Sequence, residues 1–191
     1  MTAKSRFGRD LEFGRPGAPG TVIRINPKTG ERSFDQLTWG LVPHDTKDLA
    51  TALRPIWARA EGLVEQPMFA DAFRRRRAIV AANDYFQKSS RQDAGKEFII
   101  YRRDGRPMAW AGLWEGYRLP NGEIIRSYCV ITAEAGEDVS PIHDRQPLVL
   151  EDEDLAVWLG EEPGDPAELL RTPCGGVLEC RLSSPGKPRR P

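Results

Sequence analysis

The residues best suited to chemistry lie together in the segment Ile-His-Asp-Arg-Gln-Pro-Leu-Val-Leu, at positions 142–150. His143 is one of only two histidines, and an imidazole titrates near neutral pH, so it can carry a proton or bind a phosphate. The neighbouring Asp144 can orient the ring, and the planar guanidinium of Arg145 can hold a phosphate or a carboxylate. The alternative is a structural turn before a buried strand, in which the backbone satisfies all three groups.

Composition limits the kind of protein that these residues serve. The 28 basic and 28 acidic residues cancel, so any site for a polyanion must be a local patch. Cys129, Cys174 and Cys180 have no metal-like spacing, so we expect neither a metal nor a cofactor. Free thiols suit a reducing compartment, and the chain has no apolar run of membrane-spanning length and no hydrophobic signal core. We expect a soluble, cytoplasmic protein that makes no contact with a membrane.

The order of sequence features predicts one domain with two polar ends. Residues 1–20 are rich in glycine and polar residues and predict an extended arm, and residues 186–191 predict a tail. The length between them, residues 21–185, suits one well-buried core.

The first half of the domain predicts strands at Thr21–Ile25 and Phe34–Trp39, joined by a turn, and a short helix at Lys47–Leu53. A second helix begins at Pro67, a residue favoured in the first helical turn, and ends in the run Arg74–Arg77. Its apolar stripe consists of Met68, Phe69, Ala72 and Phe73.

The second half predicts mainly hairpins. After a strand at Ala78–Ala82, the strands Phe98–Tyr101 and Met108–Trp114 are separated by Asp104-Gly105, and Ile124–Thr132 follows as a third strand. Two short acid-capped helices, at Leu155–Leu159 and after Asp165, precede a last strand at Val177–Leu182. Hairpins without crossover helices predict an α+β fold: a twisted, mainly antiparallel sheet that curls toward a barrel, with short peripheral helices.

Five blocks in this order carry a resemblance to a known family. They are Trp39–Pro43, Ala58–Glu61 with Pro67 and Phe69, Ile79–Phe86, Ala111–Glu115, and Ile142–Leu150. Together they resemble the SRAP family, the SOS-response-associated peptidases that process abasic sites in single-stranded DNA. The resemblance covers roughly residues 21–185 and implies the SRAP fold.

The resemblance also implies a chemistry and shows where this chain departs from it. In that family an N-terminal cysteine condenses through its amine and thiol with the sugar aldehyde of an abasic site. An asparagine, a glutamate and a histidine position the sugar and move protons. The histidine corresponds to His143, but the other three positions are Thr2, Trp57 and Gln87. A glutamine does not exchange protons at neutral pH, and a tryptophan fills space that the sugar needs, so we expect the covalent chemistry to be lost.

The resemblance further implies contacts with DNA. In the family reading Trp39 lies near the DNA channel, where an aromatic face can stack on an unpaired base. We expect Arg59, Arg145 and the arginine run, with Arg74 and Arg77, to contact phosphates. Each has a structural alternative. Trp39 can be a core aromatic, Arg145 can belong to an internal ion network, and the arginine run can be a helix end that complements the helix dipole.

Three hypotheses about function follow. The first is a protein of the DNA damage response that binds single-stranded or abasic DNA without a covalent crosslink. The second is an abasic-site enzyme, a lyase, crosslinker or autopeptidase, that uses the N-terminal amine and His143. The third is a non-catalytic partner of DNA-repair proteins. Trapping with borohydride separates the second hypothesis from the others because it requires an imine.

Overall fold

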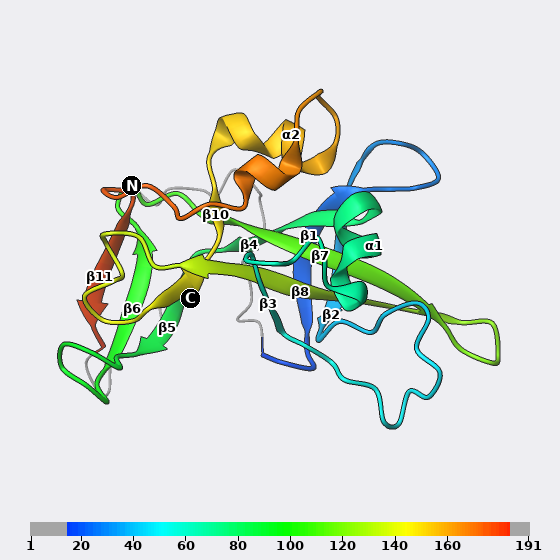
Figure 1. Cartoon of the computed structure of the whole chain (residues 1–191), viewed down its shortest axis with the longest axis horizontal. Helices are drawn as coiled ribbons and strands as arrows, with labels where there is room; N and C mark the ends of the chain where they lie inside the picture. Colours follow the sequence, from blue (N-terminus) through cyan, green and yellow to red (C-terminus); the bar gives the residue numbers. More distant parts are fainter. Residues whose placement is uncertain (1–14, 184–191) are drawn as a thin grey trace, which may run out of the picture.

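A computed structural model describes residues 15–183, and Figure 1 shows how its elements are arranged. The predicted tail, Thr2 and most of the predicted arm therefore lie outside the described residues. The strands are β1 (Pro19–Ile25), β2 (Arg32–Trp39), β3 (Trp57–Arg59), β4 (Arg77–Ala82), β5 (Asp84–Lys88), β6 (Glu97–Arg102), β7 (Met108–Arg118), β8 (Ile124–Glu134), β9 (Arg145–Pro147), β10 (Val149–Leu150) and β11 (Leu178–Leu182). The helices are α1 (Pro67–Arg75) and α2 (Leu155–Leu159), with short 3-10 helices η1 (Asp152–Asp154) and η2 (Pro166–Leu169). None of the helices in residues 15–183 has the length and apolar character that crossing a bilayer requires.

The main sheet closes on itself. Strands β7, β4, β1 and β2 are antiparallel neighbours in that order, β2 pairs in parallel with β8, and β8 pairs back with β7. Closure leaves the five strands of this ring without a free edge. The short strand β3 lies parallel to β8, while β9 and β10 extend the sheet from β8 and β7. The predicted α+β fold, with a mainly antiparallel sheet that curls toward a barrel and short helices around it, is confirmed.

Apolar residues on the two faces of the main sheet form two cores. Ile23, Leu113 and Ile131 belong to the first core, to which α1 contributes Phe69 and Phe73 and α2 contributes Trp158. The second core lies between the main sheet and a small sheet of β5, β6 and β11. Its members are Val22, Leu37, Ala78, Val80, Tyr85, Ile100, Met108, Trp110, Trp114, Tyr128, Val130, Val139, Ile142, Val149 and Leu178.

The helix predicted from Pro67 is confirmed. Pro67 occupies its first turn, and Phe69, Ala72 and Phe73 are buried, as the apolar stripe predicted. The helix ends before Arg77, whose guanidinium donates to the carbonyl oxygen of Phe73 at 2.7 Å and to that of Trp158. These bonds satisfy a carbonyl group at the C-terminal end of the helix and tie α1 to α2.

The helix predicted at Lys47–Leu53 is wrong, because this segment forms a turn at 49–51 and is otherwise irregular. The carboxylate of Asp48 accepts the backbone N–H of Ala50 at 2.9 Å and the hydroxyl of Thr51 at 3.1 Å. Such side-chain bonds compete with helical hydrogen bonds, and Pro55 disfavours helical backbone at the residue before it.

The hairpin predicted between Phe98–Tyr101 and Met108–Trp114 is also wrong. Gly105 does form a turn with a positive φ of 74°, but β6 pairs with β5 and β11 while β7 pairs with β4, β8 and β10. The connection thus passes from the small sheet to the main sheet. Pro107, which has no N–H for a ladder, precedes β7.

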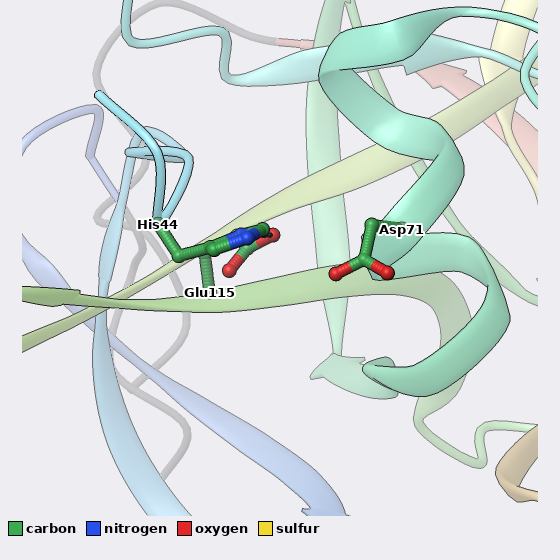
Figure 2. A group of neighbouring side chains, drawn as sticks. All are labelled: His44, Asp71 and Glu115. Carbon is green, nitrogen blue, oxygen red and sulfur yellow. Dashed lines mark hydrogen bonds and ion pairs between the residues drawn. The ribbon is translucent and has the colours of Figure 1, made fainter. Parts of the chain in front are cut away.

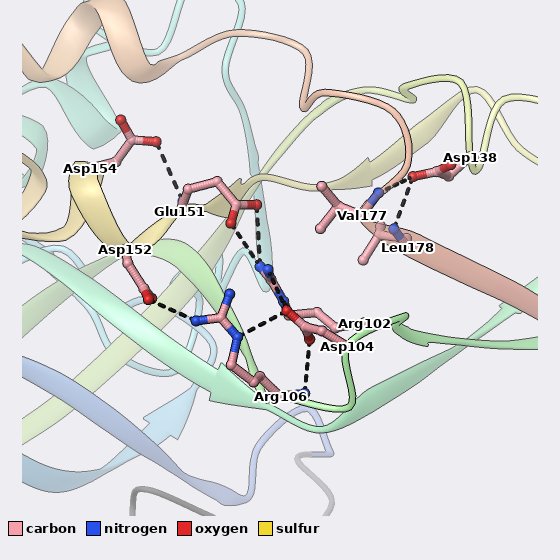
Figure 3. Close-up of polar contacts among 9 residues, drawn as sticks. All are labelled: Arg102, Asp104, Arg106, Asp138, Glu151, Asp152, Asp154, Val177 and Leu178. Atoms are coloured by element: carbon pink, nitrogen blue, oxygen red, sulfur yellow. Dashed lines mark hydrogen bonds and ion pairs between the residues drawn. The ribbon is translucent and has the colours of Figure 1, made fainter.

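Charged side chains fix this crossing between the sheets (Figure 3). Asp104 accepts hydrogen bonds from Arg102 at 3.0 Å and from the guanidinium of Arg106 at 2.9 Å. Arg102 also binds Glu151 and Arg106 binds Asp152, so the turn is tied to η1. These contacts connect segments almost fifty residues apart, which local sequence patterns do not reveal.

The remaining predicted elements are present with adjusted ends. Helix α2 spans the predicted Leu155–Leu159 and ends at Gly160, whose φ is 81°. Asp165 caps the next helix by accepting the N–H of Ala167 at 2.8 Å, but that helix is a short 3-10 segment. The last strand forms as predicted and pairs with β6.

Candidate nucleic-acid interface

His143 is held by its own neighbours in the chain. Its Nδ1 lies 2.9 Å from the backbone nitrogen of Arg145, 3.0 Å from the carbonyl oxygen of the same residue, and 3.2 Å from Asp144. When Nδ1 accepts the N–H, the ring proton is on Nε2; when Nδ1 donates to the carbonyl, Nε2 is a base. Among the described residues Nε2 has no hydrogen-bond partner, so this nitrogen is the one available for proton transfer.

Arg145 forms an internal ion network. Its guanidinium lies 2.7 Å from a carboxylate oxygen of Glu61 and 2.6 Å from the carbonyl oxygen of Thr132. This hydrogen bond to Arg145 holds the pKa of the Glu61 carboxyl below its usual value. The side chain of Arg145 is 19% exposed, so a phosphate would have to compete with Glu61 for it.

Strand β3 presents two residues that lie on the same face. Ala58 is buried in the first core, and neighbouring side chains alternate along a strand, so Trp57 and Arg59 point away from that core. Both are exposed, and the guanidinium of Arg59 has no hydrogen bond or ion pair with any residue in 15–183. Arg59 is therefore the predicted phosphate contact that the fold leaves available.

The indole of Trp57 belongs to an aromatic group. It meets Trp39 edge-on, with ring centroids 5.1 Å apart and an angle of 87° between the planes. Behind Trp39 the ring of Tyr128 lies nearly parallel, at 6.3 Å and 8°. Trp39 is fixed further by a hydrogen bond of 2.9 Å from its Nε1 to the carbonyl oxygen of Ile56. Trp39 thus holds the indole of Trp57 in place. Trp57 is 40% exposed and is the ring of this aromatic group that a ligand can reach.

The arginine run divides into outward and inward residues. Arg74 and Arg75 are exposed and lie within 3.6 Å and 3.5 Å of Asp71. Arg77 is directed inward to carbonyl oxygens of α1 and α2, as described above, so its predicted phosphate contact gives way to a structural role. Sequence alone could not distinguish the inward Arg77 from the outward arginines, because its partner Trp158 is 81 residues away from it along the chain.

Gln87 lies on β5, near the segment that carries His143. The end of β5 is joined to that segment by Ser89, whose hydroxyl donates to the carbonyl oxygen of Ile142 at 2.9 Å. The amide of Gln87 itself donates to the carbonyl oxygen of Lys88 at 2.9 Å. The structure therefore brings the β5 end and His143 into one neighbourhood, while Thr2 lies outside the described residues.

A further ionisable cluster was missed by the sequence analysis. A ring nitrogen of His44 and carboxylate oxygens of Asp71 and Glu115 lie within 4.8 Å of one another, as metal ligands would (Figure 2). The guanidinium of Arg76 contacts all three, at 2.8 Å from Glu115 and 3.4 Å from His44. We assign the cluster to an ion network that fixes the end of α1 on β7. The sequence signal for this ion network was Glu115, an acidic residue that directly follows the apolar run 111–114.

Comparisons with known proteins give the context for this surface. The model of the family described as SOS response associated peptidase (SRAP) matches residues 9–182. The abasic site processing protein YoqW of Bacillus subtilis is 33% identical over 143 residues, which are 74% of this chain and 63% of that protein. The abasic site processing protein YedK of Escherichia coli is 31% identical over 148 residues, 76% of this chain and 64% of that protein. The chain thus spans less than two thirds of the length of these relatives.

Solved structures show the same fold. A protein from Bordetella bronchiseptica superposes with a TM-score of 0.76 at 26% identity, over 88% of this chain and 85% of that chain. A protein from Bacteroides thetaiotaomicron gives a TM-score of 0.79 at 21% identity, over 88% of this chain and 75% of that chain. The second likeness concerns the fold alone.

Proposed function

This chain belongs to the SRAP family, and from that premise we propose that it acts in the DNA damage response by binding single-stranded or abasic DNA without a covalent bond. The observation that carries the proposal is strand β3, which presents an exposed indole, Trp57, and an exposed guanidinium, Arg59, on one face. Aromatic faces and cations along a groove are the usual means of holding a single strand. Relatives named as abasic site processing proteins support DNA as the partner.

The non-covalent part of the proposal rests on two residues within the chain. A covalent ring with an abasic sugar requires an amine to attack the aldehyde, loss of water from the adduct to give an imine, and addition of a thiol to the imine carbon, with proton transfers at each stage. The resemblance places a proton-carrying glutamate at Gln87, whose amide donates to Lys88 and cannot carry a proton at neutral pH. It places a small polar residue at Trp57, whose indole is held against Trp39.

His143 supports a second candidate, an imine-forming lyase that uses an N-terminal amine. Nε2 of His143 has no partner among the described residues, and Nδ1 is fixed, so the ring is suited to proton transfer. An imine forms when the amine adds to the aldehyde carbon and the adduct loses its oxygen as water, and borohydride reduces the imine to a stable amine. A borohydride-dependent adduct with abasic DNA favours this candidate, and its absence favours simple binding.

Titration with a labelled single strand at two salt concentrations tests the proposal. Each phosphate contact releases counterions, so the logarithm of affinity should fall linearly with the logarithm of salt concentration. With no net charge to add a general attraction, the slope should correspond to a few phosphates. Absence of binding at low salt, or an affinity that does not depend on salt, contradicts the proposal.

A further inference from the structure

Trp57 combines exposure with a fixed orientation. Its indole is 40% exposed on the short strand β3, and it contacts Trp39 edge-on. Trp39 is itself held by Ile56 and by the parallel ring of Tyr128. A ring held in this way has little rotamer freedom left to lose, so a planar ligand can stack on it at low entropic cost.

Two arginines lie on the segments next to this ring. Arg59 lies on the same face of β3, and Arg54 is exposed in the connection that leads to β3, where its Cβ lies close to Gly40, next to Trp39. Neither arginine has a carboxylate partner within residues 15–183. An apolar protein surface docked on Trp57 would have to desolvate these charges without compensation, which is costly. A nucleotide offers a planar base to the ring and a phosphate to the guanidinium.

We propose that Trp57 is a stacking platform for an intact, unpaired base, with Arg59 on the phosphate beside it. The inference rests on the proposed function, because it takes single-stranded DNA as the ligand, and it deepens that function by naming the nucleotides that the site selects. Stacking on Trp57 requires a base, so this site favours nucleotides that retain their bases over abasic ones. Trp57 is thereby a specificity-determining residue.

The test uses the full chain and two labelled single strands of equal length. One is an ordinary oligothymidine, and the other carries a stable abasic analogue at every position, so that the phosphates are the same and the bases are absent. Fluorescence anisotropy gives the affinity for each strand. Trp57→Leu keeps an apolar side chain against Trp39 without a ring face, and Trp57→Phe keeps a ring. Leu53→Ala is the matched control, since Leu53 is an exposed apolar residue of the preceding connection.

Wild type should bind the oligothymidine more tightly than the abasic strand. Trp57→Leu should weaken binding of the oligothymidine about fivefold or more and leave the abasic strand unchanged. Trp57→Phe should restore most of the affinity, and Leu53→Ala should change neither. Equal weakening on both strands, or no weakening, overturns the stacking role while leaving the proposed DNA binding intact. If wild type binds neither strand at low salt, the proposed function fails and the platform fails with it.

Discussion

The guanidinium of Arg145 lies 2.7 Å from the carboxylate of Glu61, and this ion pair joins the segment after β3 to β9. Arg145 also donates to Thr132 on β8, the strand that pairs with both β3 and β9. The pair therefore connects the strand that presents Trp57 with the segment that presents His143. Its role is to fix two parts of the candidate interface relative to each other.

Replacing Glu61 with Gln should make stability less dependent on pH in the acid range. The pKa of Glu61 is lowered in the folded state, so its ion pair stabilises the fold above the unfolded pKa, about 4.3, and this contribution is lost as pH falls through the folded value. Because Glu61 is 51% exposed, we expect at most about 1 kcal/mol at neutral pH.

Urea unfolding of wild type and Glu61→Gln at pH 7 and pH 3 measures this difference. It should be present at pH 7 and shrink at pH 3. Glu65→Gln is the control, since the carboxylate of Glu65 has no ion pair within residues 15–183. A difference that stays the same at both pH values would show that the charge of Glu61 is not involved.

Arg59 and Arg77 should respond differently to the same change. Arg59→Gln should weaken binding of single-stranded DNA and lower the slope of log affinity against log salt by about 0.7, because one phosphate contact is lost. Arg77→Gln should instead lower the free energy of unfolding by roughly 1.5–3 kcal/mol, since the charged donor serves carbonyl groups of two helices.

Salt titrations and urea unfolding of both variants check this assignment. Arg77→Gln should retain the salt slope of wild type wherever the protein is folded. An unaltered slope for Arg59→Gln would remove Arg59 from the interface, and a lowered slope for Arg77→Gln would return Arg77 to it.

Replacing Glu115 should lower the free energy of unfolding. Its side chain is 2% exposed and pairs with Arg76 at 2.8 Å, so Glu115→Ala leaves a half-buried cation with less compensation. We expect a loss of about 3 kcal/mol in the free energy of unfolding. Asp71→Ala should cost less, because Asp71 is 32% exposed. Urea unfolding compares the two, and a larger loss for Asp71 would contradict the assignment of the ion network.

The sequence analysis succeeded where local patterns determine structure. The apolar stripe after Pro67 and the turn glycine Gly105 lie where they were expected, because helical periodicity and positive φ depend on near neighbours. The predicted hairpin failed because both edges of β6 are occupied, one by the preceding strand β5 and the other by β11, about eighty residues later. Local sequence does not specify the pairing of β6 with β11.

The candidate site was predictable in its residue types but not in their orientation. The block around His143 drew attention to Arg145, yet its partner Glu61 is 84 residues away, so its internal role was not visible. In the same way, nothing near Trp57 in sequence indicated that Trp39 supports its ring. Resemblance to a family suggested the candidate residues, and tertiary contacts show which of their side chains remain exposed.

The most direct test of the account incubates the protein with a labelled single strand that carries a natural abasic site, and divides the mixture between a native and a denaturing gel. Binding without covalent chemistry predicts a retarded band on the native gel and only free strand on the denaturing gel, because Gln87 cannot carry the protons that ring formation needs. A stoichiometric retarded band that survives detergent and heat would contradict the account.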